Sequence, residues 1–161
     1  MASSEKNLSS FNATNNDRVA KFRFGIVVSE WNDQITEAMY EGAVDTIIKL
    51  GGQKANVHRM TVPGSFELPM AAQSLAKRDD IDAVICIGCV IQGETRHFDF
   101  ICSAVANGVT NVGLKYDKPV IFGVLTTNSM QQALDRAGGK HGNKGDEAGY
   151  TAVKMLLALI D

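Results

Sequence analysis

Four short runs of mainly apolar residues recur along the chain, and a segment with helical spacing follows each of them. The first run is RFGIVVS at residues 23–29, and the third, Ala83–Gly88, is apolar throughout. Strands without polar alternation are typical of a parallel sheet that helices cover on both faces. We therefore predict an α/β fold, a three-layer α/β/α sandwich with a four-stranded parallel sheet.

Periodicity, capping residues and glycines place the remaining elements. We expect Ser65 and Ser129 to cap helices, because a serine oxygen accepts hydrogen bonds from the first free amides. The glycine-rich segment 138–145 is expected to be a loop, and the last helix is expected to bury Ala152, Val153, Leu156, Leu159 and Ile160. The other expected strands are 54–62 and 119–125, and the other helices are 33–50, 65–77, 129–137 and one from about 96.

The length of 161 residues, with 45% hydrophobic and 21% charged residues, fits one globular domain. We assign residues 18–161 to that domain and residues 1–17 to a polar N-terminal arm. The formal charge of −2 gives no reason to expect nucleic acid as a partner. No apolar run approaches the roughly 18 residues that span a membrane, and no signal-peptide core is found. We therefore expect no membrane partner and a cytoplasmic location.

The chain has three cysteines, and this odd number argues against a disulfide framework. Cys86 and Cys89 form a C-x-x-C motif, but Cys86 lies within an expected buried strand, where residues three apart point to opposite faces. A zinc site would need further ligands, and only His97 lies near in sequence. We expect two buried thiols and no metal.

Aromatic and polar residues follow the expected strands, and ligands of such sheets bind beyond the carboxyl ends of the strands. Trp31 and Phe66 could hold a flat heterocycle between them, with Glu67 reading its polar edge. A single aromatic residue more often packs in a core. Their common place at strand ends is what favours a binding site.

The segment Gly93-Glu94-Thr95 precedes an expected helix, so its free amides could bind a phosphate or could simply form a cap. His97 lies in the first turn, where the helix dipole favours the neutral imidazole and thus proton transfer. A lone histidine is also common on surfaces. The loop 137–145 lacks Gly-Lys-Ser/Thr after a strand, and the first strand lacks G-x-G-x-x-G, so we expect no nucleotide cofactor.

Five segments together resemble the lumazine synthase family, in family order and over nearly everything after residue 20. The two longest are the most specific. The segments are Trp31-Asn32, VPGSFELP (62–69), IGCVIQGETRHFDF (87–100), PVIFGVLTT (119–127) and QALDRAGGKHGNKG (132–145). Two positions depart from the family: Gln92 stands where Arg is frequent, which would weaken ribityl or phosphate contacts, and Arg96 stands where a small residue or Pro is common.

The resemblance implies a flavodoxin-like fold and a transferase that needs no cofactor or metal. The implied reaction joins 5-amino-6-(D-ribitylamino)uracil and 3,4-dihydroxy-2-butanone 4-phosphate to give 6,7-dimethyl-8-ribityllumazine, phosphate and water, the penultimate step of riboflavin biosynthesis. It implies His97 and Arg136 as catalytic residues, and Glu94 and Thr95, through their backbone, with Arg136 as contacts of the sugar phosphate. The implied pyrimidine and ribityl contacts are Trp31, Ser65, Phe66, Glu67, Cys89, Val90, Ile91, Phe122 and Lys144.

The resemblance also implies a homo-oligomer with active sites between adjacent subunits. Pentamers are the family's basic unit, and some members assemble into sixty-subunit icosahedral shells. The compact GGKHGNKG connection is similar to the shell-forming version, the N-terminal arm can add a strand to a neighbour's sheet, and riboflavin synthase is a candidate partner. Two rivals remain open: a Schiff-base aldolase that uses Lys144, which we expect in an open loop, and a non-catalytic flavin- or lumazine-binding module or shell protein.

Overall fold

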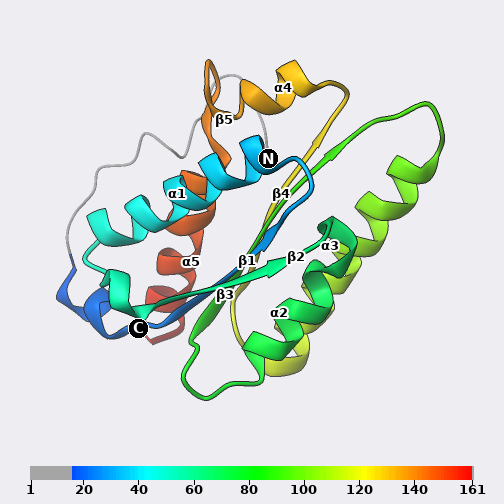
Figure 1. The fold of residues 1–161 in the computed structure, drawn as a ribbon. Coiled ribbons are helices and arrows are strands. Elements are labelled where there is room, and N and C mark those ends of the chain that lie inside the picture. The colour runs from blue at the N-terminus through cyan, green and yellow to red at the C-terminus, as the bar shows by residue number, and fades with distance from the viewer. Residues whose placement is uncertain (1–15, 161) are drawn as a thin grey trace.

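The computed structural model describes residues 16–160 and contains the expected parallel sheet, with strands in the order β2-β1-β3-β4. This is the order of the flavodoxin-like doubly wound fold over its first four strands. The predicted three-layer α/β fold is therefore confirmed (Figure 1). The strands are β1 (Phe24–Ser29), β2 (Val57–Val62), β3 (Ala83–Ile91) and β4 (Val120–Thr127).

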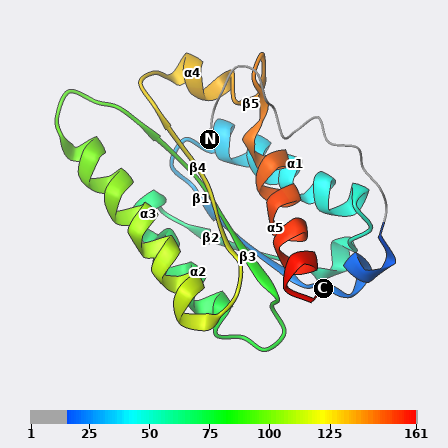
Figure 2. The ribbon, with the colours of Figure 1, turned by 180° about the vertical axis from the view of Figure 1, so that it is seen from behind.

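Helices cover both faces of this sheet, as Figures 1 and 2 show from opposite sides. One face carries α1 (Asp33–Lys49) and α5 (Lys144–Ile160), and the other carries α2 (Leu68–Ala76) and α3 (His97–Tyr116). The smaller elements are three 3-10 helices, η1 (Asp17–Lys21), η2 (Lys54–Asn56) and η3 (Ser65–Glu67), the short helix α4 (Met130–Leu134), and the hairpin of β5 (Ala137–Gly139) and β6 (Gly142–Asn143).

The sheet separates two hydrophobic cores, which explains why its central strands carry no polar alternation. Ile26 and Val28 pack into the core beneath α1 and α5, whereas Val27 between them packs into the core beneath α2 and α3. Cys86 and Cys89 divide in the same way, so the prediction of two buried thiols is confirmed. Burial raises the pKa of Cys86 to about 12 and that of Cys89 to about 11.

The prediction that Ser65 caps a helix is wrong. The chain passes through η3 before α2 begins, and Gly64 occupies the position before that turn. The hydroxyl of Ser65 is buried and turned towards β3, so that a Cβ built on Gly88 would lie 2.7 Å from Oγ. The packing of η3 against β3 therefore decides the direction of this side chain. The cap at Ser129 is confirmed, since its Oγ accepts from the amide of Gln132 at 3.3 Å.

The segment 138–145 is not a loop. Ala137 pairs with Asn143 in an antiparallel hairpin, and Gly138 and Gly142 allow positive φ values of 109° and 74° in its two short strands, on either side of the turn at residues 140–141. Lys144 is consequently the first residue of α5. α4 ends at Leu134 and not near 137, because the chain turns into β5.

Two strand boundaries and the burial of two residues also differ from the expectation. β2 begins at Val57 because residues 54–56 form η2, and β3 continues to Ile91 because it pairs with β4 as far as Thr127. Leu159 and Ile160, which were expected to be buried, are 62% and 54% exposed at the end of α5. That end of the helix therefore extends past the hydrophobic core.

The predicted arm, residues 1–17, lies outside the described residues except for Asn16 and Asp17, so its assignment stays a prediction. Asn16 donates its amide to the carbonyl of Leu50 at 3.2 Å, and its Oδ1 accepts from the amide of Arg18 at the start of η1. None of the helices in residues 16–160 has the length and apolarity that a membrane crossing requires.

Candidate functional site

The loops that follow β1 and β2 are joined to each other and to the end of β3 at the carboxyl edge of the sheet. The amide of Trp31 donates to the carbonyl of Pro63 at 3.1 Å. Nδ2 of Asn32 donates to the carbonyl of Cys89 at 3.0 Å, from a left-handed backbone with φ of 62° that asparagine tolerates better than most residues. We call the predicted site residues at the ends of these three strands the strand-end cluster: Trp31, Ser65, Phe66, Glu67, Cys89, Val90 and Ile91.

The strand-end cluster combines exposed aromatic surface with a buried hydroxyl. The indole of Trp31 is 72% exposed and the ring of Phe66 is 57% exposed, while Glu67 is also exposed. Oγ of Ser65 is the one buried side-chain nitrogen or oxygen in residues 16–160 without a hydrogen-bond partner. Because buried polar groups are nearly always paired, this hydroxyl is available to a ligand.

The end of β3 contributes backbone and packing surface to the cluster. Val90 and Ile91 are half-buried and pair with Thr126 and Thr127 of β4. Cys89 is 1% exposed, and its raised pKa keeps the thiol protonated near neutral pH. These three residues can line a pocket but cannot supply a nucleophile.

Beyond β3 the chain projects away from the body of the molecule, at the end of the sheet that also carries α4 (Figures 1 and 2). The last hydrogen bond between this segment and β4 runs from the amide of Gln92 to the carbonyl of Thr127, at 2.8 Å. The amides of the next three residues have no partner among the described residues, and Thr95 Oγ1 accepts from the amide of His97 at 3.4 Å. Glu94, Thr95 and His97 are all exposed.

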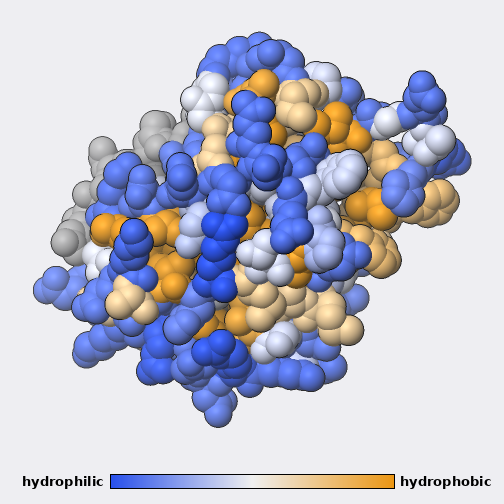
Figure 3. All heavy atoms as spheres, in the orientation of Figure 1, coloured by the Kyte–Doolittle hydropathy of each residue, from blue (hydrophilic) through white to orange (hydrophobic). Residues whose placement is uncertain are grey.

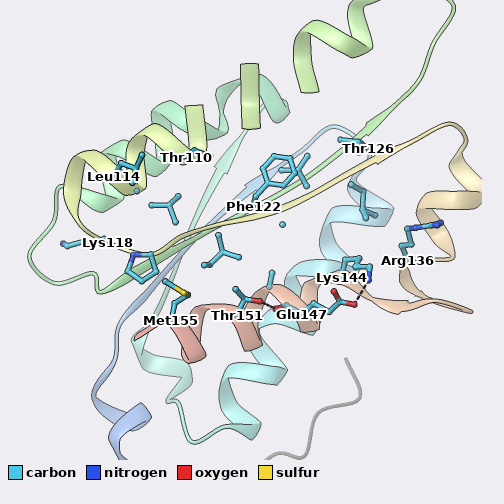
Figure 4. A pocket seen from close by; sticks show the side chains of 18 of the residues that line it. Thr110, Leu114, Lys118, Phe122, Thr126, Arg136, Lys144, Glu147, Thr151 and Met155 are labelled. Carbon is cyan, nitrogen blue, oxygen red and sulfur yellow. Dashed lines mark hydrogen bonds and ion pairs between the residues drawn. The ribbon is translucent and has the colours of Figure 1, made fainter. Parts of the chain in front are cut away.

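A groove with a volume of about 1030 Å³ runs along β4, the edge strand of the sheet, between α3 and α5. We call it the β4 groove. Arg136 and Lys144 lie at one end of it and Leu114 and Lys118 at the other, with Phe122 between them (Figure 4). Its labelled lining residues are Thr110, Leu114, Lys118, Phe122, Thr126, Arg136, Lys144, Glu147, Thr151 and Met155.

At the end of the β4 groove that holds Arg136 and Lys144, each of these two cations already has a hydrogen-bond or ion-pair partner. Nζ of Lys144 forms an ion pair with Glu147, and the two side chains are 20% and 14% exposed. The guanidinium of Arg136 donates to the carbonyl of Gln132 at 3.0 Å, and the carbonyl of Arg136 accepts from the amide of Lys144 at 2.8 Å. The backbones of Arg136 and Lys144 are thus joined, and both residues line the same end of the groove, where an anion could bind.

Lys144 does not lie in the open loop that was expected. It is the first residue of α5, and its Nζ forms an ion pair with Glu147, whereas a Schiff-base lysine needs an unpaired amine. Glu147 was missed by the sequence analysis, although its i,i+3 spacing from Lys144 at a helix start was a usable signal. Asn32 was also missed as a residue that connects the loop after β1 to the end of β3.

The structure does not bring all the predicted site residues together within one chain. Phe122, Arg136 and Lys144 line the β4 groove, but no residue of the strand-end cluster does, and neither does His97. β1 and β4 are separated by β3, and thus by about 10 Å at the usual strand spacing. Within residues 16–160, no group of three or more His, Cys, Asp or Glu side chains could hold a metal ion.

The sequence is similar to known proteins over almost its whole length. Residues 21–159 match the model of the family described as 6,7-dimethyl-8-ribityllumazine synthase. The protein of that name from Cytophaga hutchinsonii is 61% identical over 160 residues, which are 99% of this chain and 100% of that protein. Those from Flavobacterium johnsoniae and Parabacteroides distasonis are 52% and 50% identical, over 96% and 97% of this chain and 82% and 98% of their own lengths. The matched residues include the strand-end cluster and the β4 groove.

Proposed function

Since this chain belongs to the 6,7-dimethyl-8-ribityllumazine synthase family, we propose how its residues carry out the reaction of that family. The chain is an enzyme, a transferase of riboflavin biosynthesis. It condenses 5-amino-6-(D-ribitylamino)uracil with 3,4-dihydroxy-2-butanone 4-phosphate and forms 6,7-dimethyl-8-ribityllumazine, phosphate and water.

One observation carries the proposal: the site residues of one chain fall into two complementary groups. The strand-end cluster offers aromatic surface and hydrogen-bonding groups but contains no Lys or Arg, whereas the β4 groove holds Arg136 and Lys144. The groove is open along an edge strand. We therefore propose that the strand-end cluster of one subunit meets the β4 groove of an adjacent subunit, and that each active site lies between them.

In this arrangement the pyrimidine lies against Trp31 and Phe66, which fit a flat ring, with Phe122 contributed by the neighbour. The free hydroxyl of Ser65, the carboxylate of Glu67 and the backbone at Cys89–Ile91 bind its polar edge and the ribityl chain. Lys144, at the end of the neighbour's groove that also holds Arg136, contacts the same substrate. Small-molecule sites generally combine apolar surface with a few such polar groups.

The sugar phosphate binds where free amides and a guanidinium meet. The amides of Glu94 and Thr95 have no partner among the described residues and precede α3, whose N-terminal end favours an anion. Arg136 exchanges its carbonyl partner for the phosphate, to which it can donate two parallel bonds. Both groups then stabilise the phosphate as it leaves.

The chemistry follows from holding the two substrates together. The pyrimidine amine attacks the butanone carbonyl, water is lost to give an imine, phosphate is eliminated, and the ring closes with loss of a second water. His97 carries protons between these steps, since an imidazole nitrogen can both accept and donate a proton. Orientation supplies much of the rate, and no electrons are exchanged with an external acceptor, so the proposal includes no cofactor or metal.

Assembly into pentamers, and of these into a sixty-subunit icosahedral shell, is part of the proposal. Its support is the apolar surface that one chain leaves exposed, including Met70 at 72%, Phe100 at 70% and Leu114 at 74%. Figure 3 shows hydrophobic side chains gathered over α2 and along the right-hand edge of the molecule. Sedimentation of the full chain distinguishes pentamer from shell. Arm pairing with a neighbour's sheet, riboflavin synthase as a partner and the cytoplasmic location stay predictions.

The direct test is to mix the purified protein with both substrates and to follow lumazine absorbance and phosphate release. We expect both products in equal amounts, and neither when one substrate is omitted. A non-catalytic flavin- or lumazine-binding module would bind the ring without releasing phosphate. Borohydride trapping with the sugar phosphate tests the aldolase alternative, and we expect no covalent label on Lys144.

A further inference from the structure

Asn143 belongs to none of the groups of site residues described above, yet its side-chain amide connects two helices beside the β4 groove. It directly precedes α5, and its Oδ1 accepts a bond of 2.8 Å from the amide of Gly145, which caps the helix. Its Nδ2 donates a bond of 2.8 Å to the carbonyl of Ala38 in α1. One side chain thus caps α5 and ties its first turn to α1.

α1 and α5 cross so closely that the hydrogen bond from Asn143 to Ala38 cannot lengthen or shift without moving a helix. A Cβ at Gly145 would overlap the carbonyl oxygen of Met39, and one at Gly149 would lie 2.6 Å from the carbonyl oxygen of Ala43. The two backbones are therefore in near contact. Because close-packed interiors transmit small displacements and do not absorb them, a shift at Asn143 moves the first turn of α5.

The first turn of α5 carries two charged residues that line the β4 groove, Lys144 and Glu147. Lys144 follows Asn143, pairs with Glu147, and binds the carbonyl of Arg136 through its amide. We propose that Asn143 is a positioning residue for the reaction: it sets the start of α5 against α1 so that Lys144 and Arg136 face the same ligand. This inference rests on the function proposed above, because it takes the groove as a substrate-binding surface.

The two bonds explain why an asparagine is required at this position. The amide of Gly145 needs an acceptor and the carbonyl of Ala38 needs a donor, and a carboxamide supplies both. Aspartate has the same shape and still caps the helix, but it places a second acceptor against the carbonyl of Ala38. Serine also caps, but its side chain ends one atom short of Ala38. Both substitutions keep the cap and remove the tie.

The chain contains a matched control at the other end of the sheet. Nδ2 of Asn56 donates to the carbonyl of Ala20 at 3.0 Å, which ties η2 to η1 near the start of β2. Asn56→Asp removes the same kind of bond, between the same kinds of atom, far from the carboxyl edge of the strands. A merely structural effect of losing such a tie should therefore appear equally in Asn56→Asp and in the Asn143 variants.

The experiment compares Asn143→Asp, Asn143→Ser and Asn56→Asp in the full-length, assembled protein, with kcat, KM for each substrate and urea midpoints. We expect both Asn143 variants to lose at least about tenfold in kcat/KM for the sugar phosphate, mainly through KM, because a displacement of about 1 Å can cost 100-fold. Asn56→Asp should stay within about twofold, with a similar loss of stability.

Three results would overturn the inference. They are an unchanged KM in both Asn143 variants, equal losses in all three variants, and failure of both Asn143 variants to fold while Asn56→Asp folds. The last result would mean that the tie maintains the fold and does not adjust the site. Wild-type protein that forms no lumazine would reject the proposed function itself, before any variants are compared.

Discussion

Trp31, Ser65 and Cys89 are positioned by the ends of the sheet itself, whereas Arg136 and Lys144 are positioned by helix ends and by each other's backbone. The strand-end cluster keeps one hydroxyl without a partner, at a cost of about 1–3 kcal/mol to the free protein. In the β4 groove Arg136 and Lys144 each already have a partner. The strand-end cluster, which we propose to hold the pyrimidine ring, is thus preformed. The β4 groove, which we call the anion side of the site, must exchange hydrogen-bond partners when a ligand binds.

This difference affects the two sides of the site in different ways. A preformed pocket loses little free energy to ordering when it binds, so its contacts convert directly into affinity. Arg136 gives up a neutral carbonyl for a charged phosphate, which is a favourable exchange because charge-assisted bonds are about twice as strong. Substitutions in the two regions should therefore change different quantities.

The largest expected effect concerns the packing of α5, which lines the β4 groove, against α1. In Gly145→Ala the new Cβ overlaps the carbonyl oxygen of Met39, and backbone cannot move aside as a side chain can. We expect a loss of about 3 kcal/mol or more in the free energy of unfolding, despite the better helix propensity of alanine. Urea denaturation measures it.

Gly93→Ala is the matched control, because a Cβ at Gly93 meets no atom within 4 Å. We expect its free energy of unfolding to stay within about 0.5 kcal/mol of wild type. Equal stability of the two variants would show that α1 and α5 can separate, and would remove the rigid support inferred for the groove.

The second effect concerns the anion side. In Arg136→Ala we expect the KM for the sugar phosphate to rise by about 10- to 100-fold, because a charged hydrogen bond contributes about 1.5–3 kcal/mol. The KM for the pyrimidine should change little. Arg23→Ala, at the opposite edge of the sheet, is the control for loss of one positive charge. A similar rise in both variants would point to general charge attraction and not to a phosphate contact at Arg136.

The same two regions show how far the sequence could predict this molecule. β1 and β3 were predictable because both of their faces are buried, which leaves an apolar run that few other structures produce. The position of the strand-end cluster then followed from a general rule about parallel sheets. The direction of the Ser65 side chain did not follow, because it depends on η3 packing against Gly88, which is remote in sequence.

The residues of the β4 groove were harder to predict. Their sequence patterns are short, and rules based on local residue preferences assign them to the wrong structure. Four glycines between residues 138 and 145 indicate a loop, yet three of them lie in the two strands of a hairpin and Gly145 enters a helix crossing. Glu147 resembles any acidic residue that favours a helix start. Only the position of Lys144 on the same turn reveals the ion pair.

The third effect concerns His97, which is the first residue of α3 and belongs neither to the strand-end cluster nor to the β4 groove. We expect His97→Gln to lower kcat by about tenfold and to leave both KM values nearly unchanged, because proton transfer is lost while the binding groups stay in place. Steady-state kinetics with each substrate varied in turn measure it. A rise in KM without a change in kcat would instead make His97 a binding residue.

The smallest effect isolates the buried hydroxyl of the preformed side. Ser65→Ala removes an oxygen that has no partner in the free protein, so we expect the free energy of unfolding to rise by about 1 kcal/mol. The KM for the pyrimidine should rise by about fivefold, because one hydrogen bond to the ligand is lost. Ser74→Ala, an exposed serine on α2, should change neither quantity. Lower stability with an unchanged KM would mean that the hydroxyl serves the fold, and the strand-end cluster would then lose the feature that distinguishes it from ordinary core packing.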